Sequence, residues 1–199
     1  MGSRIDISCQ GIGGNFMRKT SLFFVFLVLM LSLHAFSSTY AVTTDNQIVL
    51  LKDDGTWELV EEAVDEYGIP KVRIDIPFVF ENIAITIKNI FKYGDCIIFD
   101  FFIFNNSDEM ISMDYVSFDL RDIEGFNYDL RTYSSEAPEK YINRRLNGKI
   151  RPHGSLRGYL FLEISEDIEL NELYMNHSDF ISSKTAAISI RDIKIETLK

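Results

Sequence analysis

The side chains best suited to acid–base chemistry are few in this sequence. Only three histidines occur, and two lie beyond the first forty residues: His153 in a Pro-His-Gly turn and His177 in an Asn-His-Ser-Asp segment. Either imidazole could act as a general base near neutral pH. Ser155 lies close to His153 in the sequence, but no Gly-x-Ser-x-Gly elbow surrounds it. We therefore predict that both histidines are surface turn residues, and we assign no catalytic residue.

Acidic side chains gather in two predicted turns and raise the alternative of a calcium site. They are Asp53 and Asp54 in one turn, and Asp119, Asp122 and Glu124 around the other. Ca²⁺ prefers carboxylate oxygens, but neither group has the Asp-x-Asp-x-Asp-Gly spacing that wraps one ion. Zinc sites need more Cys and His ligands than this sequence places together. We predict solvated turn acids, with no metal site and no cofactor.

Aromatic and basic side chains gather in the longest polar stretch, residues 133–149. Tyrosine and arginine are enriched at the hot spots of protein interfaces. Loops on rigid scaffolds also carry much of the binding that proteins do. We predict a partner-binding surface made by Tyr133, Tyr141, Arg144 and Arg145.

The elements that would position these residues are almost all strands. Apolar and polar residues alternate over residues 72–80, 83–93, 116–121, 126–130 and 156–164, and this period of two indicates half-buried strands. Pro77 should confine the first of these to a sheet edge or break it in two. Residues 96–104 are apolar on both faces except at Asp100, which predicts a central strand. The last strand is predicted at 185–196, with a bulge where its apolar phase slips.

No segment keeps a helical period, so the fold class is all-β. Short strands joined by tight turns predict an antiparallel, immunoglobulin-like β-sandwich over residues 72–199. Residues 42–71 form a β-hairpin and a linker, because residues 48–52 and 56–60 flank an Asp-Asp-Gly turn. A two-stranded hairpin is marginal alone, so we expect it to dock on the sandwich through Trp57.

The first 41 residues have the pattern of a secretory signal peptide. Arg18 and Lys19 precede the apolar run 22–31, and small residues follow it. We predict cleavage after Ala41, with a cut after Ala35 as the alternative. The rival is an uncleaved membrane anchor, but the run is shorter than the roughly 20 residues that a spanning helix needs. Residues 1–16 do not resemble a signal peptide, and Met17 is a more natural start.

Composition and cysteine content exclude several classes of protein. With 46% hydrophobic and 25% charged residues, the sequence is neither a disordered chain nor a polytopic membrane protein. Its formal net charge of −10 argues against nucleic-acid binding, which depends on Lys and Arg. Cys9 lies in the predicted signal peptide and Cys96 in an apolar strand. We therefore predict no disulfide, no lipid anchor and a buried, inert Cys96 thiol.

Three segments in this order and spacing resemble a known family. They are the strand and polar turn at 99–109, the Phe-Asp-Leu-Arg-Asp-Ile-Glu-Gly hairpin at 118–125, and the turn and strand at 150–163. Together, the region from Ile83 to Lys199 is similar to the telokin-like immunoglobulin-fold domains of secreted bacterial proteins and lipoproteins of unknown function. The Leu-Leu-Lys-Asp-Asp-Gly-Thr-Trp hairpin also resembles a segment seen just after signal peptides in exported bacterial proteins. The missing lipidation cysteine and the long loop at 133–149 depart from that family.

The resemblance implies a fold and no common activity, because a fold does not fix a function. From all of these features we predict an exported, non-enzymatic binding or structural module of the bacterial cell envelope, in the periplasm or outside the cell. Its partner would be another envelope or surface protein, with no nucleic acid and no stable membrane insertion once the signal is removed. The alternatives are a Ca²⁺-dependent structural module and a small envelope enzyme with an unrecognised site.

Overall fold

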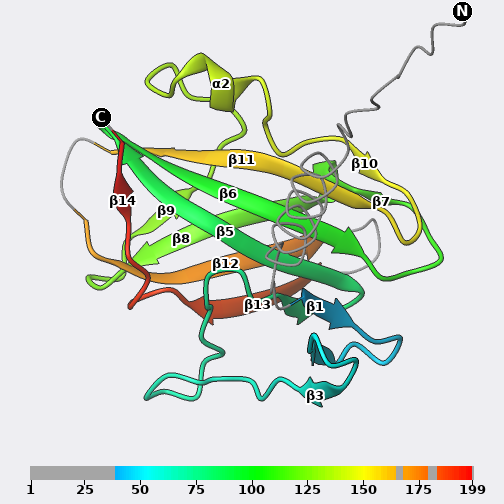
Figure 1. Ribbon diagram of the computed structural model, residues 1–199. Helices are drawn as coiled ribbons and strands as arrows, with labels where there is room; N and C mark the ends of the chain where they lie inside the picture. Colours follow the sequence, from blue (N-terminus) through cyan, green and yellow to red (C-terminus); the bar gives the residue numbers. More distant parts are fainter. Residues whose placement is uncertain (1–38, 165–167, 179–182, 199) are drawn as a thin grey trace, which may run out of the picture. The chain divides into compact units, whose positions relative to one another are not determined.

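The computed structural model describes residues 39–164, 168–178 and 183–198. The chain divides by its contacts into two units, residues 1–37 and 38–199, and the second unit contains all of the described residues. Its regular structure is almost entirely β-strand (Figure 1). Among the described residues, no helix is long and apolar enough to span a membrane.

Two sheets make up most of this unit. The first has the order β11–β6–β5–β14, with β4 paired to the start of β5, and the second has the order β13–β12–β8–β9. The strands of the first sheet are β4 (Phe78–Phe80), β5 (Ile83–Tyr93), β6 (Cys96–Asn105), β11 (Ser155–Glu163) and β14 (Glu196–Thr197). Those of the second are β8 (Val116–Asp122), β9 (Asn127–Asp129), β12 (Leu170–Ser178) and β13 (Ser183–Ser189).

Three smaller sets of elements complete the described fold. An N-terminal sheet has the order β1–β2–β3, with β1 at Thr39–Val42, β2 at Ile48–Leu51 and β3 at Trp57–Leu59. Strand β7 (Ile111–Ser112) pairs with β10 (Lys149–Ile150). A 3-10 turn occupies Met113–Tyr115, and the short helix α2 occupies Glu139–Ile142.

The main core lies between the two large sheets. Alternate residues of β6 point into it, and the Phe101 ring meets the Phe118 ring of β8 with centroids 4.9 Å apart. The other strands contribute buried residues in the same alternating way, among them Ile85, Ile87, Leu120, Leu160, Leu173 and Met175. Burial of such apolar surface from both sheets is what holds a sandwich together. The prediction of an all-β, antiparallel sandwich preceded by a β-hairpin is confirmed.

A second, smaller cluster of buried residues lies on the opposite face of β6. Its buried members are Cys96 and Ile98 of β6, Tyr159 and Phe161 of β11, and Ala137 and Tyr141 from the chain before β10. This explains why residues 96–104 are apolar on both faces: the sheet is covered on both sides along part of its length. The predicted buried Cys96 is confirmed as buried, and burial raises the pKa of its thiol.

Two strand predictions were wrong for related reasons. Of residues 72–80, only Phe78–Phe80 forms a strand, because Asp75 has a φ of 66° and the chain turns just before Pro77. At the other end, β13 stops at Ser189, a turn follows, and the chain crosses to pair β14 with β5 in parallel. The slip in apolar phase after Ile190 therefore marks a change of sheet and not a bulge.

The N-terminal sheet differs from its prediction in two ways. Trp57 does not dock it on the sandwich, since 61% of the side chain is exposed. Instead, the Asn106 side-chain amide donates to the Thr43 carbonyl and to Asn46 Oδ1, both at 2.9 Å. The sheet also has a third strand, because all four residues of β1 pair with β2. The proposed cleavage after Ala41 falls inside β1, and the rest of the predicted signal peptide lies outside the described residues.

Candidate functional site

The predicted binding stretch lies along the exposed edge of β11. We call residues 131–146 the edge segment. It is tied to β11 at both ends by backbone hydrogen bonds: Arg131 and Phe161 exchange two, each of 2.8 Å, and the Leu146 N–H donates to the Tyr159 carbonyl at 3.0 Å. The edge segment thus covers the edge of the sheet, which would otherwise present unpaired backbone groups.

Side chains fasten the middle of the edge segment. The Ser134 hydroxyl and the Ser135 N–H donate to Glu163 Oε1, at 2.6 and 3.0 Å. Hydrogen bonding by Ser134, opposed by desolvation, lowers the pKa of Glu163. The carboxylate is therefore ionised at neutral pH and accepts both bonds.

Gly158 allows the closest approach between the edge segment and β11. A Cβ built at this position would lie 2.6 Å from Leu146 Cα and 2.7 Å from Leu146 N. No larger residue fits there without moving one of the two backbones. The long loop is therefore held in one place on the sheet, and this constraint was not visible in the sequence beyond the glycine itself.

Tyr141 belongs to the core and not to the predicted binding surface. It lies in α2 with only 8% of its surface exposed, and its ring contacts Phe91 at 5.9 Å and Tyr159 at 5.0 Å between centroids. The second contact is edge-to-face, a favoured aromatic geometry. The assignment of Tyr141 to a partner-binding site is therefore wrong, because the sheet face beneath the edge segment needs an apolar cover.

The other three predicted residues remain on the surface. Tyr133 is 57% exposed, and Arg144 and Arg145 are both exposed at the end of the edge segment, just before Leu146. Within the described residues, neither guanidinium forms an ion pair or a side-chain hydrogen bond. The nearby Lys140 ammonium lies over the Tyr141 ring, 4.7 Å from its centroid. The structure therefore presents two adjacent cationic side chains on a fixed backbone.

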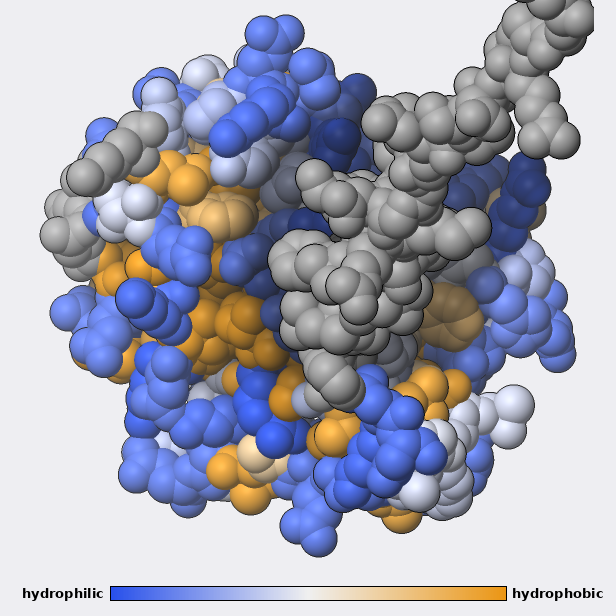
Figure 2. Space-filling view, in the orientation of Figure 1, coloured by the Kyte–Doolittle hydropathy of each residue, from blue (hydrophilic) through white to orange (hydrophobic). Residues whose placement is uncertain are grey.

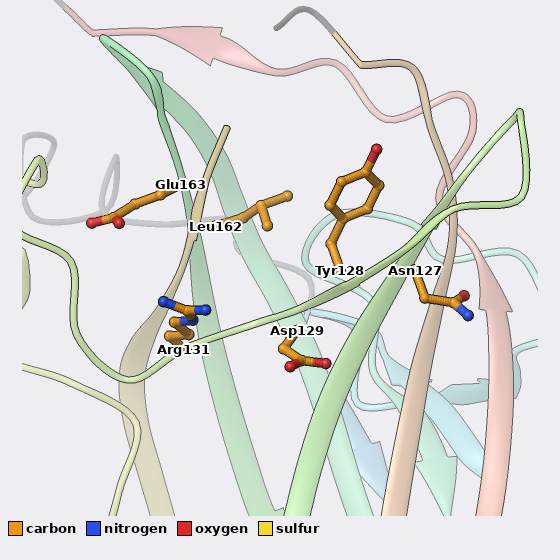
Figure 3. Close-up of a pocket in the computed structure, with 6 residues that line it drawn as sticks. All are labelled: Asn127, Tyr128, Asp129, Arg131, Leu162 and Glu163. Carbon is orange, nitrogen blue, oxygen red and sulfur yellow. The ribbon is translucent and has the colours of Figure 1, made fainter. Parts of the chain in front are cut away.

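A polar pocket of about 350 Å³ opens beside the start of the edge segment. Six residues of β9, β11 and the connection between the sheets line it: Asn127, Tyr128, Asp129, Arg131, Leu162 and Glu163 (Figure 3). Asn127 points away from the other five in this view. The Tyr128 hydroxyl donates to Asp122 Oδ2 at 2.9 Å. The pocket holds two carboxylates and one guanidinium, so it has no single charge to select a small ligand.

The two histidines differ in their exposure and in their carboxylate partners. His153 is an exposed turn residue whose Nε2 lies 3.0 Å from Asp108 Oδ1. His177 is partly buried, and its Nδ1 lies 2.7 Å from Glu81 Oε2. Lys184 forms an ion pair with the same carboxylate, and these two partners lower the pKa of Glu81. The prediction of a surface turn residue therefore fits His153 and is wrong for His177.

His177 also lines a groove of about 820 Å³ at the end of the sandwich. Glu81 lines it too, and its φ of 55° places it in the left-handed region that non-glycine residues seldom adopt. Exposed Met110 and Tyr115 form part of the same wall. Glu81 and His177 are 96 residues apart in the sequence, and they meet because the turn between β4 and β5 of the first sheet lies against β12 of the second.

The acidic turns are occupied by hydrogen bonds within the protein. Asp54 Oδ1 accepts from the Thr56 N–H at 2.9 Å and from its hydroxyl at 2.6 Å. Asp122 accepts from the N–H groups of Glu124 and Phe126, both at 2.9 Å. In the part of the chain that the structure describes, no three His, Cys, Asp or Glu side chains come together as a metal site.

In Figure 2 polar residues form most of the visible surface, and apolar residues gather over its middle, near β5. Other exposed large apolar residues are Leu51, Trp57 and Leu59 of the N-terminal sheet, where Leu51 pairs with Trp57, and Ile123 and Phe126 in the turn after β8. Single exposed apolar residues are normal on a protein surface.

Comparison with known proteins gives no family for this chain. No protein-family description matches it, and no curated protein matches it significantly. Several solved structures are similar in fold. The yjhA protein from Bacillus subtilis has 14% identity and a TM-score of 0.46, over 59% of this chain and 98% of that one. A protein described as a "putative lipoprotein" from Staphylococcus aureus has 15% identity and a TM-score of 0.39, over 65% and 97%. An uncharacterized β-sandwich protein from Clostridium difficile has 13% identity and a TM-score of 0.38, over 67% and 99%.

Proposed function

We propose that this protein is an exported, non-enzymatic binding module of the bacterial cell envelope. Its partner is an acidic segment of another envelope or surface protein, bound by Arg144 and Arg145, with Tyr133 of the same edge segment as a further contact. The observation that carries the proposal is the pair of exposed guanidiniums that find no carboxylate partner among the residues that the structure describes. Export rests on the signal-peptide pattern of residues 1–41.

Arg144 and Arg145 are cationic side chains in an acidic chain, which has a formal charge of −10 with 30 acidic against 20 basic residues. Three of the eight described arginines, Arg121, Arg157 and Arg191, form ion pairs with carboxylates. Arg144 and Arg145 belong to the five that form none within the described part of the chain. Arginine is suited to bidentate binding of carboxylates. Two arginines that do not use this capacity internally can use it on a partner.

The backbone beneath Arg144 and Arg145 is already ordered before a partner arrives. The Tyr159 N–H donates to the Arg144 carbonyl at 2.9 Å, and Leu146 packs directly on Gly158. A surface that is fixed in advance loses less conformational entropy on binding. This is the arrangement expected of a recognition loop on a rigid scaffold.

The binding proposal can be tested with a defined probe. We would titrate a fluorescent glutamate-rich peptide with the wild-type protein and with an Arg144→Ser/Arg145→Ser variant. The variant should bind at least about tenfold more weakly, because it loses two charge-assisted contacts. An Arg151→Ser/Lys194→Ser variant makes the same change of net charge elsewhere on the surface and should bind as the wild type does. Equal losses in both variants would show only a general charge effect and would overturn the proposal.

The export proposal has a separate test. A native mass spectrum of the protein from the envelope fraction of its own host would give the mature N-terminus and any bound partner. A chain that begins after residue 35 or 41 supports export with cleavage. A chain found only in the cytoplasm, with residues 17–41 still attached, would contradict it.

One observation favours a second candidate, a small envelope hydrolase. Glu81 holds His177 in the wall of the 820 Å³ groove, and a carboxylate that orients an imidazole is a frequent part of acid–base sites. A panel of ester, amide and glycoside substrates should show no turnover if the protein is a binding module. Sustained turnover that is lost in His177→Ala but kept in His153→Ala would favour the hydrolase instead.

A further inference from the structure

The bond between Asn147 and Gly148 is the one Asn-Gly bond in the sequence. It lies directly after the edge segment and before β10, where Asn147 is exposed. Within the described residues, the Asn147 side chain makes no hydrogen bond and the Gly148 N–H donates none. A side-chain amide and the following backbone nitrogen are therefore both free to react with each other.

We propose that Asn147 is a site of spontaneous deamidation in the folded protein. The Gly148 nitrogen attacks Asn147 Cγ, so a C–N bond forms and closes a succinimide ring. The bond from Cγ to the side-chain nitrogen breaks, and ammonia leaves with the proton from the Gly148 nitrogen. Water then opens the ring at either carbonyl, which yields aspartate or isoaspartate. No oxidant, metal or enzyme is needed for this sequence of steps.

Local geometry favours the reaction at this bond. Gly148 has a φ of +109°, and a Cβ built on it would meet no atom within 4 Å, so neither a side chain nor a neighbouring atom crowds the Gly148 backbone on that side. Asp54 and Gly55 form a comparable pair in an exposed turn, but two hydrogen bonds from Thr56 hold the Asp54 carboxylate. Asn143 is equally exposed in the same loop, but Arg144 follows it in place of a glycine. Asp54 is held by hydrogen bonds, and Asn143 is not followed by a glycine. Asn147 is followed by a glycine and, within the described residues, has no hydrogen bond to hold its side chain.

The modification would change both charge and backbone length at a tightly held point. Two backbone hydrogen bonds flank Asn147. Before it, the Leu146 N–H donates to the Tyr159 carbonyl, and after it, the Gly148 carbonyl accepts from the Met113 N–H at 2.9 Å. Isoaspartate adds one methylene group to the main chain between these two anchors, so they can no longer both be satisfied. Either product also places a carboxylate two residues from Arg145. If Arg145 binds an acidic partner, as proposed above, deamidation weakens that binding.

The test is a timed incubation of the full chain in mildly alkaline buffer, followed by peptide mass mapping. The peptide that contains Asn147 should gain the mass of an NH₂-to-OH exchange, and an Asn147→Gln variant should not. Asn143, on the same loop, should stay unchanged and serves as the internal control. If Asn147 is modified in urea but not in the folded protein, the fold protects it and the proposal is wrong.

A second measurement separates this inference from the proposed function. An Asn147→Asp variant reproduces one product and should bind the glutamate-rich peptide more weakly than the wild type. If deamidation occurs but this variant binds normally, the modification site is supported and its effect on Arg145 is contradicted. If the wild type does not bind the peptide at all, the proposed function fails while the mass measurement still decides the modification.

Discussion

At the scale of single residues, the least expected feature is a charged pair inside an apolar strand. Asp100 of β6 is 2% exposed, and Arg157 of β11 donates to it through Nε at 3.0 Å and Nη2 at 2.7 Å. The guanidinium reaches the solvent, since about half of that side chain is exposed. The pair explains why a charged residue is tolerated in the middle of this strand.

Removing Arg157 should therefore destabilise the protein strongly. We expect Arg157→Met to lower the free energy of unfolding by about 2–4 kcal/mol, because Asp100 would be left as an unpaired buried charge. A combined Asp100→Leu/Arg157→Met variant should recover most of that loss. Urea unfolding of the wild type, both single variants and the double variant gives the coupling energy. Additive losses would show that the two side chains do not act as a pair.

Asp119 of β8 has a neighbour of the same charge. It lies directly opposite Asp129 of β9. Burial, and then the charge of Asp129, raises the pKa of Asp119, although Asn176 donates to it at 2.7 Å. A raised pKa in the folded state means that the folded protein binds more protons than the unfolded chain does. Stability should therefore fall as the pH rises through the raised pKa of Asp119.

Replacing Asp129 by asparagine should relieve this repulsion. We expect Asp129→Asn to raise the free energy of unfolding by up to about 1 kcal/mol at neutral pH, the size of a like-charge cross-strand pair. The gain should be smaller in acid. Asp119 is then protonated in the wild type, so the repulsion that the substitution removes is already absent. Urea unfolding at neutral pH and in mild acid measures both effects, and Asp53→Asn in an exposed turn is the matched charge control. A gain that does not depend on pH would contradict the explanation.

At the scale of elements, the contact between the edge segment and β11 decides where the candidate site lies. Gly158→Ala should displace residues 144–146, because the new Cβ would overlap Leu146. We expect a loss of about 1–3 kcal/mol, as for other overpacked sites. Trypsin should also cut after Arg144 or Arg145 faster than in the wild type. Ser155→Ala, at the exposed start of β11, should change neither property.

Strand β1 gives a second prediction at this scale. Cleavage after Ala41 would remove three of its four residues and leave β2 with β3 alone. A chain that begins at Val42 should therefore show faster amide hydrogen exchange in β2 than a chain that begins at Phe36, because a two-stranded hairpin is marginal in water. Exchange at β6 should be the same in both chains. Equal protection of β2 would show that β1 is dispensable.

At the scale of the whole molecule, Cys96 reports on the cooperativity of the fold. It is the first residue of β6, fully buried in a cluster with Ala137 and Tyr141 of the edge segment, and burial raises the pKa of its thiol. In a chain that begins after Ala41 it is the one cysteine. We expect labelling by a thiol reagent to occur at the rate of global unfolding and to speed up with urea. Rapid labelling without denaturant would show that the edge segment opens independently of the core.

The strand pattern and the location of the core followed from local features of the sequence. Alternation along residues 83–93 and 156–164 and the doubly apolar run at 96–104 identified β5, β11 and β6, because a strand turns successive side chains to opposite faces. The exposed positions of Tyr133, Arg144 and Arg145 were also predictable, since charged and polar side chains in a long loop remain in water. The acidic turns closed by local hydrogen bonds agree with their residue types as well.

Everything that depends on contacts between distant residues was decided by the tertiary structure. Tyr141 has the same residue type as Tyr133, yet it is buried because the outer face of β6 needs a cover that the sequence does not locate. Residues 72–80 alternate like a strand, but the turn at Asp75 and the lack of an N–H on Pro77 keep most of them out of the sheet. Glu81 meets His177 because the two sheets pack against each other, which no local pattern in the sequence specifies. The alternation of residue types specifies which face of a strand is apolar. The segment that packs on that face is specified only when the whole chain folds.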